Sequence, residues 1–365
     1  MTPLKLNLIR RIKAEGPLSV ADYMAECLFN PHHGYYVKSD PFGAKGDFIT
    51  APDISQIFGE LTAFWLIQIW EDQGKPTPFT LCEIGPGRGV WMQDIIATIS
   101  KLQPEMSKAM DVAIIEKSDR LAKVQADTLR NLPIKINWLT EIAELSNKPT
   151  FIIANELFDA IPMRQYVKTS QGWQERMVAL DTNQELMFTI GTGSLSGDLL
   201  PLNASAAPEG SIFEYAPARE ALAQQIAEHI GEHGGAALLI DYGHAKSDLG
   251  DTLQAVRNHA YEDVFANPGQ ADLTSHVDFE ALNIAATMAD TQTYKIISQA
   301  EFLLAMGLVE RAGALGSDKD NAARETITKA VHRLAGNDVG QMGDMFKVSC
   351  MTQNGKPTPE PFTKL

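Results

Sequence analysis

The chain has 365 residues, of which 44% are hydrophobic and 21% charged, the composition of a globular protein rather than a disordered one. Its 46 acidic residues outnumber 31 basic ones, and the net charge of −15 argues against a broad nucleic-acid-binding surface and favours a cationic partner. Three scattered cysteines without zinc or disulfide spacing indicate a reducing compartment and no metal site.

The N-terminal part of the chain reads as helical. Apolar spacing predicts one helix over residues 4–12, a second over 20–27, and a third over 53–65 that stops near Gly74. A glycine-bounded loop at 43–50 precedes the third helix. No apolar run reaches the roughly 18 residues of a membrane span, so we expect no stable membrane insertion.

The most informative segment is 80–89, where a short apolar strand carrying Glu83 continues into three alternate glycines. These glycines are Gly85, Gly87 and Gly89. They free the backbone to turn sharply and let a ligand approach the main chain, and helical spacing over 90–99 puts the turn at a helix N-terminus. The pattern predicts a nucleotide-type ligand site; a tight turn without a ligand is the alternative for this segment alone.

The glycine spacing distinguishes between cofactors. The dinucleotide fingerprint requires a small residue three places after its second glycine, where this chain has Val90, and the extra glycine arrives one residue early, at Gly89. Glu-x-Gly-x-Gly-x-Gly is the spacing of S-adenosylmethionine (SAM) enzymes, and the turn lacks the Walker pattern. We therefore expect SAM as the cofactor, with Glu83 and the three glycines at its binding site.

A second acid closes a second strand. Residues 112–116 read as a buried strand that ends in Glu116 and is followed by a helix. In a doubly wound sheet an acid at this position accepts hydrogen bonds from the ribose hydroxyls of the ligand. An acid that simply faces water is the alternative, but two acids that close strands in consecutive βα units favour a shared ligand site.

The alternation of strands and helices predicts an α/β fold with a mostly parallel sheet. Further strands are expected at 134–139, 150–154, 236–241 and 346–351. Residues 163–212 differ, because short polar-apolar alternations separated by turns predict antiparallel hairpins inserted as a β-rich cover. The expected domains are a helical N-terminal extension over 1–75, a SAM-binding core over 76–162 and 213–365, and the inserted cover over 163–212.

Five motifs in order along nearly the whole chain resemble the MidA-like family, which includes the mitochondrial complex I assembly-factor methyltransferase. They are residues 46–56, 83–89, 154–162, 240–243 and 272–279. The resemblance implies a class I SAM-dependent methyltransferase with a Rossmann-like fold. It also implies, as substrate, an arginine of a protein such as a subunit of respiratory complex I.

The motif at 154–162 follows the strand at 150–154, at the edge of the sheet where ligands bind in open parallel sheets. Asn155, Glu156 and Asp159 would stand beside the methyl group of the cofactor. A protonated arginine is a poor nucleophile, so we expect carboxylates to hold its guanidinium, Glu156 first and Asp159 second, with Asn155 at the cofactor. The alternative is that Asn155 and Glu156 only cap the next helix.

Asp47 is the third catalytic candidate. It would bind either the ammonium group of SAM or the target guanidinium; a glycine-flanked helix entry without ligand contact is the alternative. His244 and His276 match no familiar metal-ligand spacing, so no metal is expected.

The sequence thus predicts a SAM-dependent protein arginine methyltransferase. Methylation of another nucleophile, either a small molecule or a different side chain, is the alternative within the enzyme class. A complex I assembly chaperone without catalysis is the alternative outside it. We expect a cytoplasmic protein if the chain is bacterial and a mitochondrial matrix protein if it is eukaryotic.

Overall fold

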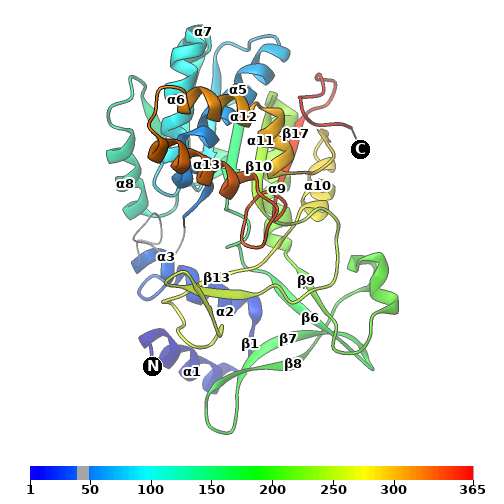
Figure 1. The fold of residues 1–365 in the computed structure, drawn as a ribbon. Coiled ribbons are helices and arrows are strands. Elements are labelled where there is room, and N and C mark those ends of the chain that lie inside the picture. The colour runs from blue at the N-terminus through cyan, green and yellow to red at the C-terminus, as the bar shows by residue number, and fades with distance from the viewer. Residues whose placement is uncertain (39–48, 365) are drawn as a thin grey trace. The chain divides into compact units, whose positions relative to one another are not determined.

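The computed structural model describes residues 1–38 and 49–364 (Figure 1). The chain divides into two compact units, each assembled from three separate segments. The N-terminal unit comprises Met1–Phe48, Phe158–Ala221 and Lys246–Asp278. The sheet unit comprises Ile49–Leu157, Leu222–Ala245 and Phe279–Leu365. The domain limits given by the sequence patterns stay a prediction.

The sheet unit is built on a mostly parallel sheet, as predicted. Its strand order is β15-β17-β10-β5-β2-β3-β4. The strands are β2 (Phe79–Ile84), β3 (Met110–Ile115), β4 (Ile136–Leu139), β5 (Thr150–Asn155), β10 (Gly235–His244), β15 (Thr291–Thr293) and β17 (Phe346–Gln353), with β16 (Ile297–Ser298) also paired to β17. β10, β5, β2, β3 and β4 run parallel to their neighbours, whereas β17 is antiparallel to both β10 and β15. β2 is buried along its whole length, including Thr80 and Glu83 among its apolar residues.

One continuous apolar core, which includes Trp65, Trp91 and Phe151, joins the sheet to helices of this unit. These helices are α4 (Ala51–Ile54), α5 (Gln56–Asp72), α6 (Val90–Leu102), α7 (Pro104–Ala109), α8 (Asp119–Leu129), α11 (Gln299–Ala305), α12 (Leu308–Gly316) and α13 (Asn321–Ala335). The unit also contains η1 (Ile142–Glu144), most of α9 (Pro217–His233) and α10 (Phe279–Thr287). Figure 1 shows α11, α12 and α13 packed together. Within the described ranges, no helix is both long and apolar enough to cross a membrane.

The helix predicted over 53–65 is interrupted at Ser55. This residue is extended, with φ −162° and ψ 139°, and its hydroxyl accepts a hydrogen bond of 3.3 Å from the N–H of Ile57. Ser55 therefore ends α4 and serves as the N-cap of α5, because a serine side chain satisfies a free N–H of the first helical turn. The break leaves α4 as a separate short element just before the long helix.

The N-terminal unit is a set of helices against antiparallel strands. Its helices are α1 (Pro3–Glu15), α2 (Val20–Phe29) and α3 (Tyr35–Lys38), with η2 (Gly197–Leu199) and η3 (Leu202–Ala206) in the later part. The main sheet has the order β1-β7-β6-β9, with β8 paired to β7. These strands are β1 (Leu18–Ser19), β6 (Arg164–Thr169), β7 (Gly172–Leu180), β8 (Leu186–Ser194) and β9 (Ile212–Tyr215). The antiparallel hairpins predicted for 163–212 are confirmed.

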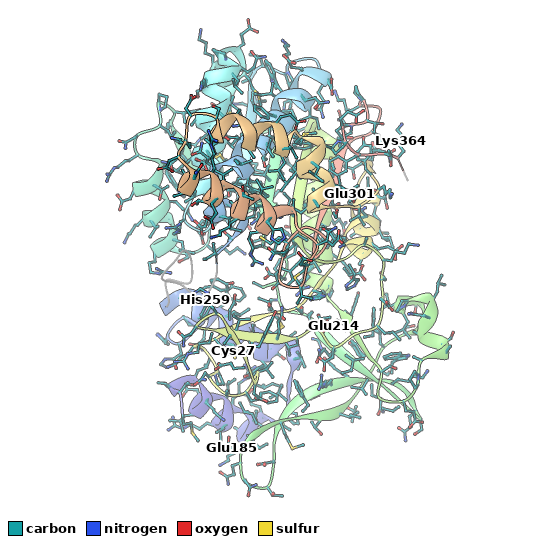
Figure 2. All side chains as sticks on the ribbon, viewed as in Figure 1. Cys27, Glu185, Glu214, His259, Glu301 and Lys364 are labelled. Atoms are coloured by element: carbon teal, nitrogen blue, oxygen red, sulfur yellow. The ribbon has the colours of Figure 1, made fainter. Side chains whose placement is uncertain are left out.

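Two smaller features complete this unit. A second sheet has the order β12-β11-β13, from β11 (Gln254–Arg257), β12 (Ala260–Glu262) and β13 (Asp272–Thr274), and β14 (Val277–Asp278) follows. Cys27, labelled in Figure 2, lies in α2, and burial raises the pKa of its thiol to about 12. A thiol in this state is protonated and unreactive at neutral pH.

Candidate active site

The topology of the central sheet selects one edge for ligand binding. From β2 the chain proceeds to β3 and β4 on one side, and then returns to form β5 on the other side of β2. The carboxyl ends of β2 and β5 therefore flank a switch point, with Glu83 in register with Ile153. Ligands bind outside the strand ends at such a point. The glycine turn and the 154–162 motif both begin here.

The glycine turn has the backbone conformation that its sequence predicts. Gly85, Gly87 and Gly89 have φ values of 66°, 53° and 80°, in the left-handed region that favours glycine. A Cβ at Gly85 would lie 2.9 Å from Cδ1 of Leu157. Gly89 is the N-cap of α6 and donates its N–H to the carbonyl of Pro86 at 2.8 Å. The turn therefore exposes main chain at a helix N-terminus, where an anionic or hydrogen-bonding ligand group is favoured.

Glu83 is buried, with 3% of its surface exposed, and bonds to the backbone of Met92 in the first turn of α6. Since the N-cap is glycine and has no side chain to offer, the Glu83 carboxyl supplies the missing acceptor. Burial raises the pKa of Glu83 to about 8. Glu83 thus stabilises the start of α6 through Met92, and its direct contact with the cofactor stays a prediction.

Glu116 directly follows β3, as predicted, and is anchored at the strand end. Its N–H donates to the carbonyl of Leu139 at 3.0 Å, and its Oε1 accepts the N–H of Ser118 at 2.7 Å. Burial raises the pKa of this carboxyl, while its hydrogen bonds with Ser118 and Gln125 oppose the rise. The geometry fits an acid held ready for the hydroxyls of a ribose.

Gln125 of α8 is a site residue that the sequence patterns miss. Its amide nitrogen donates at 3.0 Å both to the carbonyl of Gly87 and to Oε2 of Glu116. Its amide oxygen accepts the indole N–H of Trp138 at 3.1 Å. A glutamine in an amphipathic helix ordinarily reads as a surface residue, so spacing carries no signal for this role.

Asn155 and Glu156 lie at the end of β5, next to the turn. Glu156 has φ 50°, a left-handed conformation that is costly for a residue other than glycine and that often marks functional sites. Its N–H donates to the carbonyl of Ile240 at 2.9 Å, and its Oε1 accepts the side-chain amide of Asn155 at 3.1 Å. In the structure the side-chain amide of Asn155 therefore contacts the carboxylate of Glu156, the two residues predicted for this site.

The short helix α4 contributes Ala51 and Asp53 to the site, and neither was among the predicted site residues. The N–H of Ala51 lies 3.4 Å from Oε1 of Glu156, and Asp53 forms an ion pair with Arg88 of the glycine turn. Asp53 is further held by the hydroxyl of Thr50 at 3.3 Å. The motif at 46–56 was the only signal for this arrangement. Asp47 lies outside the described residues.

Asp159 belongs to the N-terminal unit, so its predicted pairing with Glu156 stays a prediction. Within that unit it is buried, and its charge, with that of Asp272, helps to raise the pKa of Tyr36, for which burial is the larger cause. The hydroxyl of Tyr36 donates to Oδ2 of Asp272 at 3.1 Å. Two of the family motifs, at 154–162 and 272–279, therefore meet in this unit.

Arg219 fixes these two motif segments to each other. Only 2% of it is exposed, and its guanidinium donates to the carbonyls of Asp159, Ile161 and His276 at 3.0, 3.0 and 2.8 Å. It also donates to the hydroxyl of Ser275 at 2.6 Å. A buried arginine that donates to four oxygen atoms rigidifies the loops that it joins. Among the described residues, neither His244 nor His276 belongs to a cluster of three or more side chains that could hold a metal.

The residues at the switch point fit SAM. The turn exposes main chain where Gly85 has no Cβ, Glu116 follows the end of β3, where the ribose acid is predicted, and Oδ1 of Asn155 is buried without a hydrogen-bond donor among the described residues. A donor from a ligand would satisfy this buried acceptor. The Asn155 oxygen and the Glu116 carboxylate are suited to the ammonium and hydroxyl groups of SAM.

Comparisons with known proteins agree with the expected family and cofactor. Residues 61–297 match the family described as "Putative S-adenosyl-L-methionine-dependent methyltransferase". The human "Protein arginine methyltransferase NDUFAF7, mitochondrial" is 35% identical over 371 residues, covering 95% of this chain and 82% of its own. The Drosophila melanogaster homologue of that protein is 33% identical, covering 95% and 84%.

A solved structure extends the agreement to three dimensions. A crystal structure from Burkholderia thailandensis bound to S-adenosyl-homocysteine superposes with a TM-score of 0.83 at 26% identity, covering 98% of this chain and 93% of its own. S-adenosyl-homocysteine is what remains of SAM after methyl transfer. With the glycine turn, the strand order and these relatives in agreement, the chain belongs to this family and is a SAM-dependent methyltransferase.

Proposed function

We propose that this methyltransferase transfers the methyl group to an arginine side chain of a protein. The observation that carries the proposal is the strained Glu156, with φ 50°, whose carboxylate accepts hydrogen bonds from Asn155 at 3.1 Å and Ala51 at 3.4 Å. Strain of about 1–3 kcal/mol in a backbone persists where the surrounding structure requires it, and functional sites are where it gathers. The arginine methyltransferase names of the relatives support the same substrate.

The chemistry of arginine explains why such a carboxylate is needed. When bound, SAM supplies a methyl group attached to a positively charged sulfur. A nucleophile attacks this methyl carbon in line, and the sulfur leaves. The Glu156 carboxylate would hold the guanidinium by charge-assisted hydrogen bonds, aim one nitrogen, and accept the proton that this nitrogen gives up. Asn155 and Ala51 fix the orientation of the carboxylate. The net charge of −15 favours a cationic target segment.

The identity of the target is the finer part of the proposal. From the family resemblance, we propose a subunit of respiratory complex I as the protein that is methylated. This puts the reaction where that complex is assembled, the mitochondrial matrix in a eukaryote and the cytoplasm in a bacterium. Asp159, the second carboxylate candidate, and Asp47 are proposed to assist Glu156 with the guanidinium.

The test uses purified protein, methyl-labelled SAM and an extract of source cells that lack the protein. We expect one labelled polypeptide, with the label released as methylarginine after acid hydrolysis. The Glu156→Gln protein in a parallel reaction is the matched control, and it should bind SAM but leave the polypeptide unlabelled. Label in a small molecule, or in a residue other than arginine, would contradict the arginine assignment and leave the SAM-dependent activity standing.

A further inference from the structure

Gln125 lies on α8 (Asp119–Leu129) and is completely buried, yet its side chain is polar. Every polar atom of its amide is used. The nitrogen donates at 3.0 Å to the carbonyl of Gly87 and at 3.0 Å to Oε2 of Glu116, and the oxygen accepts the indole N–H of Trp138 at 3.1 Å. One side chain thus joins the glycine turn after β2, the strand-end acid after β3, and the strand β4.

The indole of Trp138 determines which way the amide points. If the amide of Gln125 were rotated by 180°, its oxygen would face the Gly87 carbonyl and the Glu116 carboxylate, which are both acceptors. The same rotation would set its NH2 group against the donor of Trp138. Only the observed orientation satisfies all the groups, because a carbonyl, a carboxylate and an indole N–H have fixed donor and acceptor roles.

The backbone of α8 is as closely placed as the side chain. A Cβ built on Gly89 would lie 3.5 Å from Cδ1 of Leu129 and 3.7 Å from Cα of Gln125. The helix therefore packs directly against the turn. This contact sets the distance over which the Gln125 amide has to reach, and a glutamine spans it at ordinary hydrogen-bond lengths.

We propose that Gln125 is a positioning residue for SAM, which locks the Glu116 carboxylate to the glycine turn so that both halves of the cofactor site are in place before the cofactor arrives. Without this bridge the two halves come from consecutive βα units, and the Glu116 carboxylate keeps the Ser118 hydrogen bond at Oε1 but loses its link to the glycine turn at Oε2. A pre-ordered site binds more tightly, because less side-chain freedom is lost on binding. The inference depends on the cofactor and not on the identity of the methylated substrate.

The experiment measures the affinity for SAM and for S-adenosyl-homocysteine by calorimetry in the full-length protein. Gln125→Met keeps the volume of the side chain and removes its hydrogen bonds, and we expect its dissociation constants to rise about tenfold, the effect of losing hydrogen bonds to a charged group. Trp138→Phe keeps an aromatic ring and removes the donor that orients the amide, and a rise of about threefold is expected.

Gln93→Met is the matched control. Gln93 also carries an amide that joins two helices, since its nitrogen donates to the carbonyl of Thr128 at 3.0 Å. That bond contacts neither Glu116 nor the glycine turn. The backbone N–H of Gln93 bonds to the Gly89 carbonyl, and the substitution leaves that bond in place. The dissociation constants of the Gln93→Met protein should therefore stay within about twofold of wild type.

The pH dependence of binding separates positioning from a purely structural effect. Burial raises the pKa of Glu116, and the Gln125 amide opposes that rise. In Gln125→Met the pKa of Glu116 should increase further, so the loss of SAM affinity on acidification should begin at a higher pH than in wild type. In a Glu116→Ala background, where nothing remains to be positioned, Gln125→Met should cost much less than it does alone.

Wild-type affinity and an unshifted pH profile in Gln125→Met would overturn the proposal. So would an equal loss in the Glu116→Ala background, since the bridge would then act through general packing. If the Gln125 variant does not fold, Trp138→Phe decides: an affinity and a pH profile equal to those of wild type refute the proposal, and a weaker affinity with the acidic limb shifted upward supports it.

Discussion

The side-chain amide of Asn155 donates a hydrogen bond of 3.1 Å to the carboxylate of Glu156, the residue that follows it at the end of β5. Adjacent residues in a regular strand point to opposite faces, so this contact is possible only because Glu156 has left the strand geometry, with φ 50°. The backbone conformation and the orientation of the carboxylate are therefore one feature, and changing either should affect the chemistry.

Glu156→Gln should keep SAM affinity within a few-fold of wild type and lower methylation of the protein target by at least about a hundredfold. The substitution preserves size and removes the charge that stabilises the guanidinium as it is alkylated, and losses of this scale follow removal of a transition-state partner. Single-turnover methyl transfer and calorimetry on the same preparation check it. A normal transfer rate would move the clamp elsewhere, and lost SAM binding would assign Glu156 to the cofactor.

Glu116→Ala should weaken SAM binding by about 1–3 kcal/mol through the lost hydrogen bonds to the ribose, without unfolding the protein. The carboxylate lies at the strand end and bonds to Ser118 and Gln125, so its loss leaves β3 intact. Calorimetry measures the affinity and thermal unfolding the stability. An unchanged dissociation constant would place the ribose acid elsewhere.

Gly85→Val should abolish SAM binding. A side chain at this position starts 2.9 Å from Cδ1 of Leu157, and φ 66° is strained for a branched residue. The wild-type protein should bind SAM and S-adenosyl-homocysteine with micromolar-scale affinity and should not bind NAD. Binding of NAD in preference to SAM, measured in the same calorimeter, would contradict the interpretation of the turn.

Glu83 gives the protein a specific pH dependence. Its pKa is raised from 4.5 to about 8, mainly by burial, so the folded state holds a proton that the unfolded state releases. Stability should therefore fall as pH rises between about 4.5 and about 8. Asp94, raised to about 6 by burial and by Glu60, adds to the lower part of this range.

Glu83→Gln should flatten that dependence. A glutamine oxygen still accepts the Met92 hydrogen bond, and the group no longer titrates, so the contribution of Glu83 should disappear while those of Asp94 and the other shifted groups remain. Melting temperatures from about pH 5 to about pH 9 test this, with wild type alongside. Parallel curves for the two proteins would mean that Glu83 does not carry the proton.

Arg219→Met should destabilise the protein by at least about 3 kcal/mol, because it leaves the buried carbonyls of Asp159, Ile161 and His276 without their donor. Arg164→Met is the control: its side chain is 42% exposed and pairs with Glu175, and at most about 1 kcal/mol should be lost. Chemical denaturation measures both. Equal effects would remove Arg219 from its role in fixing the two motif segments.

The sequence predicts the parallel sheet and the glycine turn well, for a local reason. β2, β3 and β5 are buried and mostly apolar strands, so their residue types alone indicate them. Glycine is the residue that a left-handed turn favours. Antiparallel hairpins at β6, β7 and β8 are equally visible, because alternation and turn residues are short-range signals.

Other elements depend on information that apolar spacing lacks. The spacing runs unbroken through Ser55, so the break between α4 and α5 is a capping effect that periodicity hides. α13 (Asn321–Ala335) buries only Leu334 completely, while Ile327, Val331 and Ala335 on the same face pack against the core partly buried. Gln125 and Arg219 act through partners that are distant in sequence, which no local pattern reports.

Because Glu156 has a left-handed backbone, saturation mutagenesis can separate its effect on folding from its effect on methyl transfer. Glycine and asparagine suit φ 50°, so cells selected only for abundance of the protein should retain both at position 156. β-branched residues should be depleted under the same selection. Cells selected for methyl transfer should keep glutamate alone. The difference between the two amino-acid distributions at this one codon would measure how much stability the protein loses by keeping glutamate for methyl transfer.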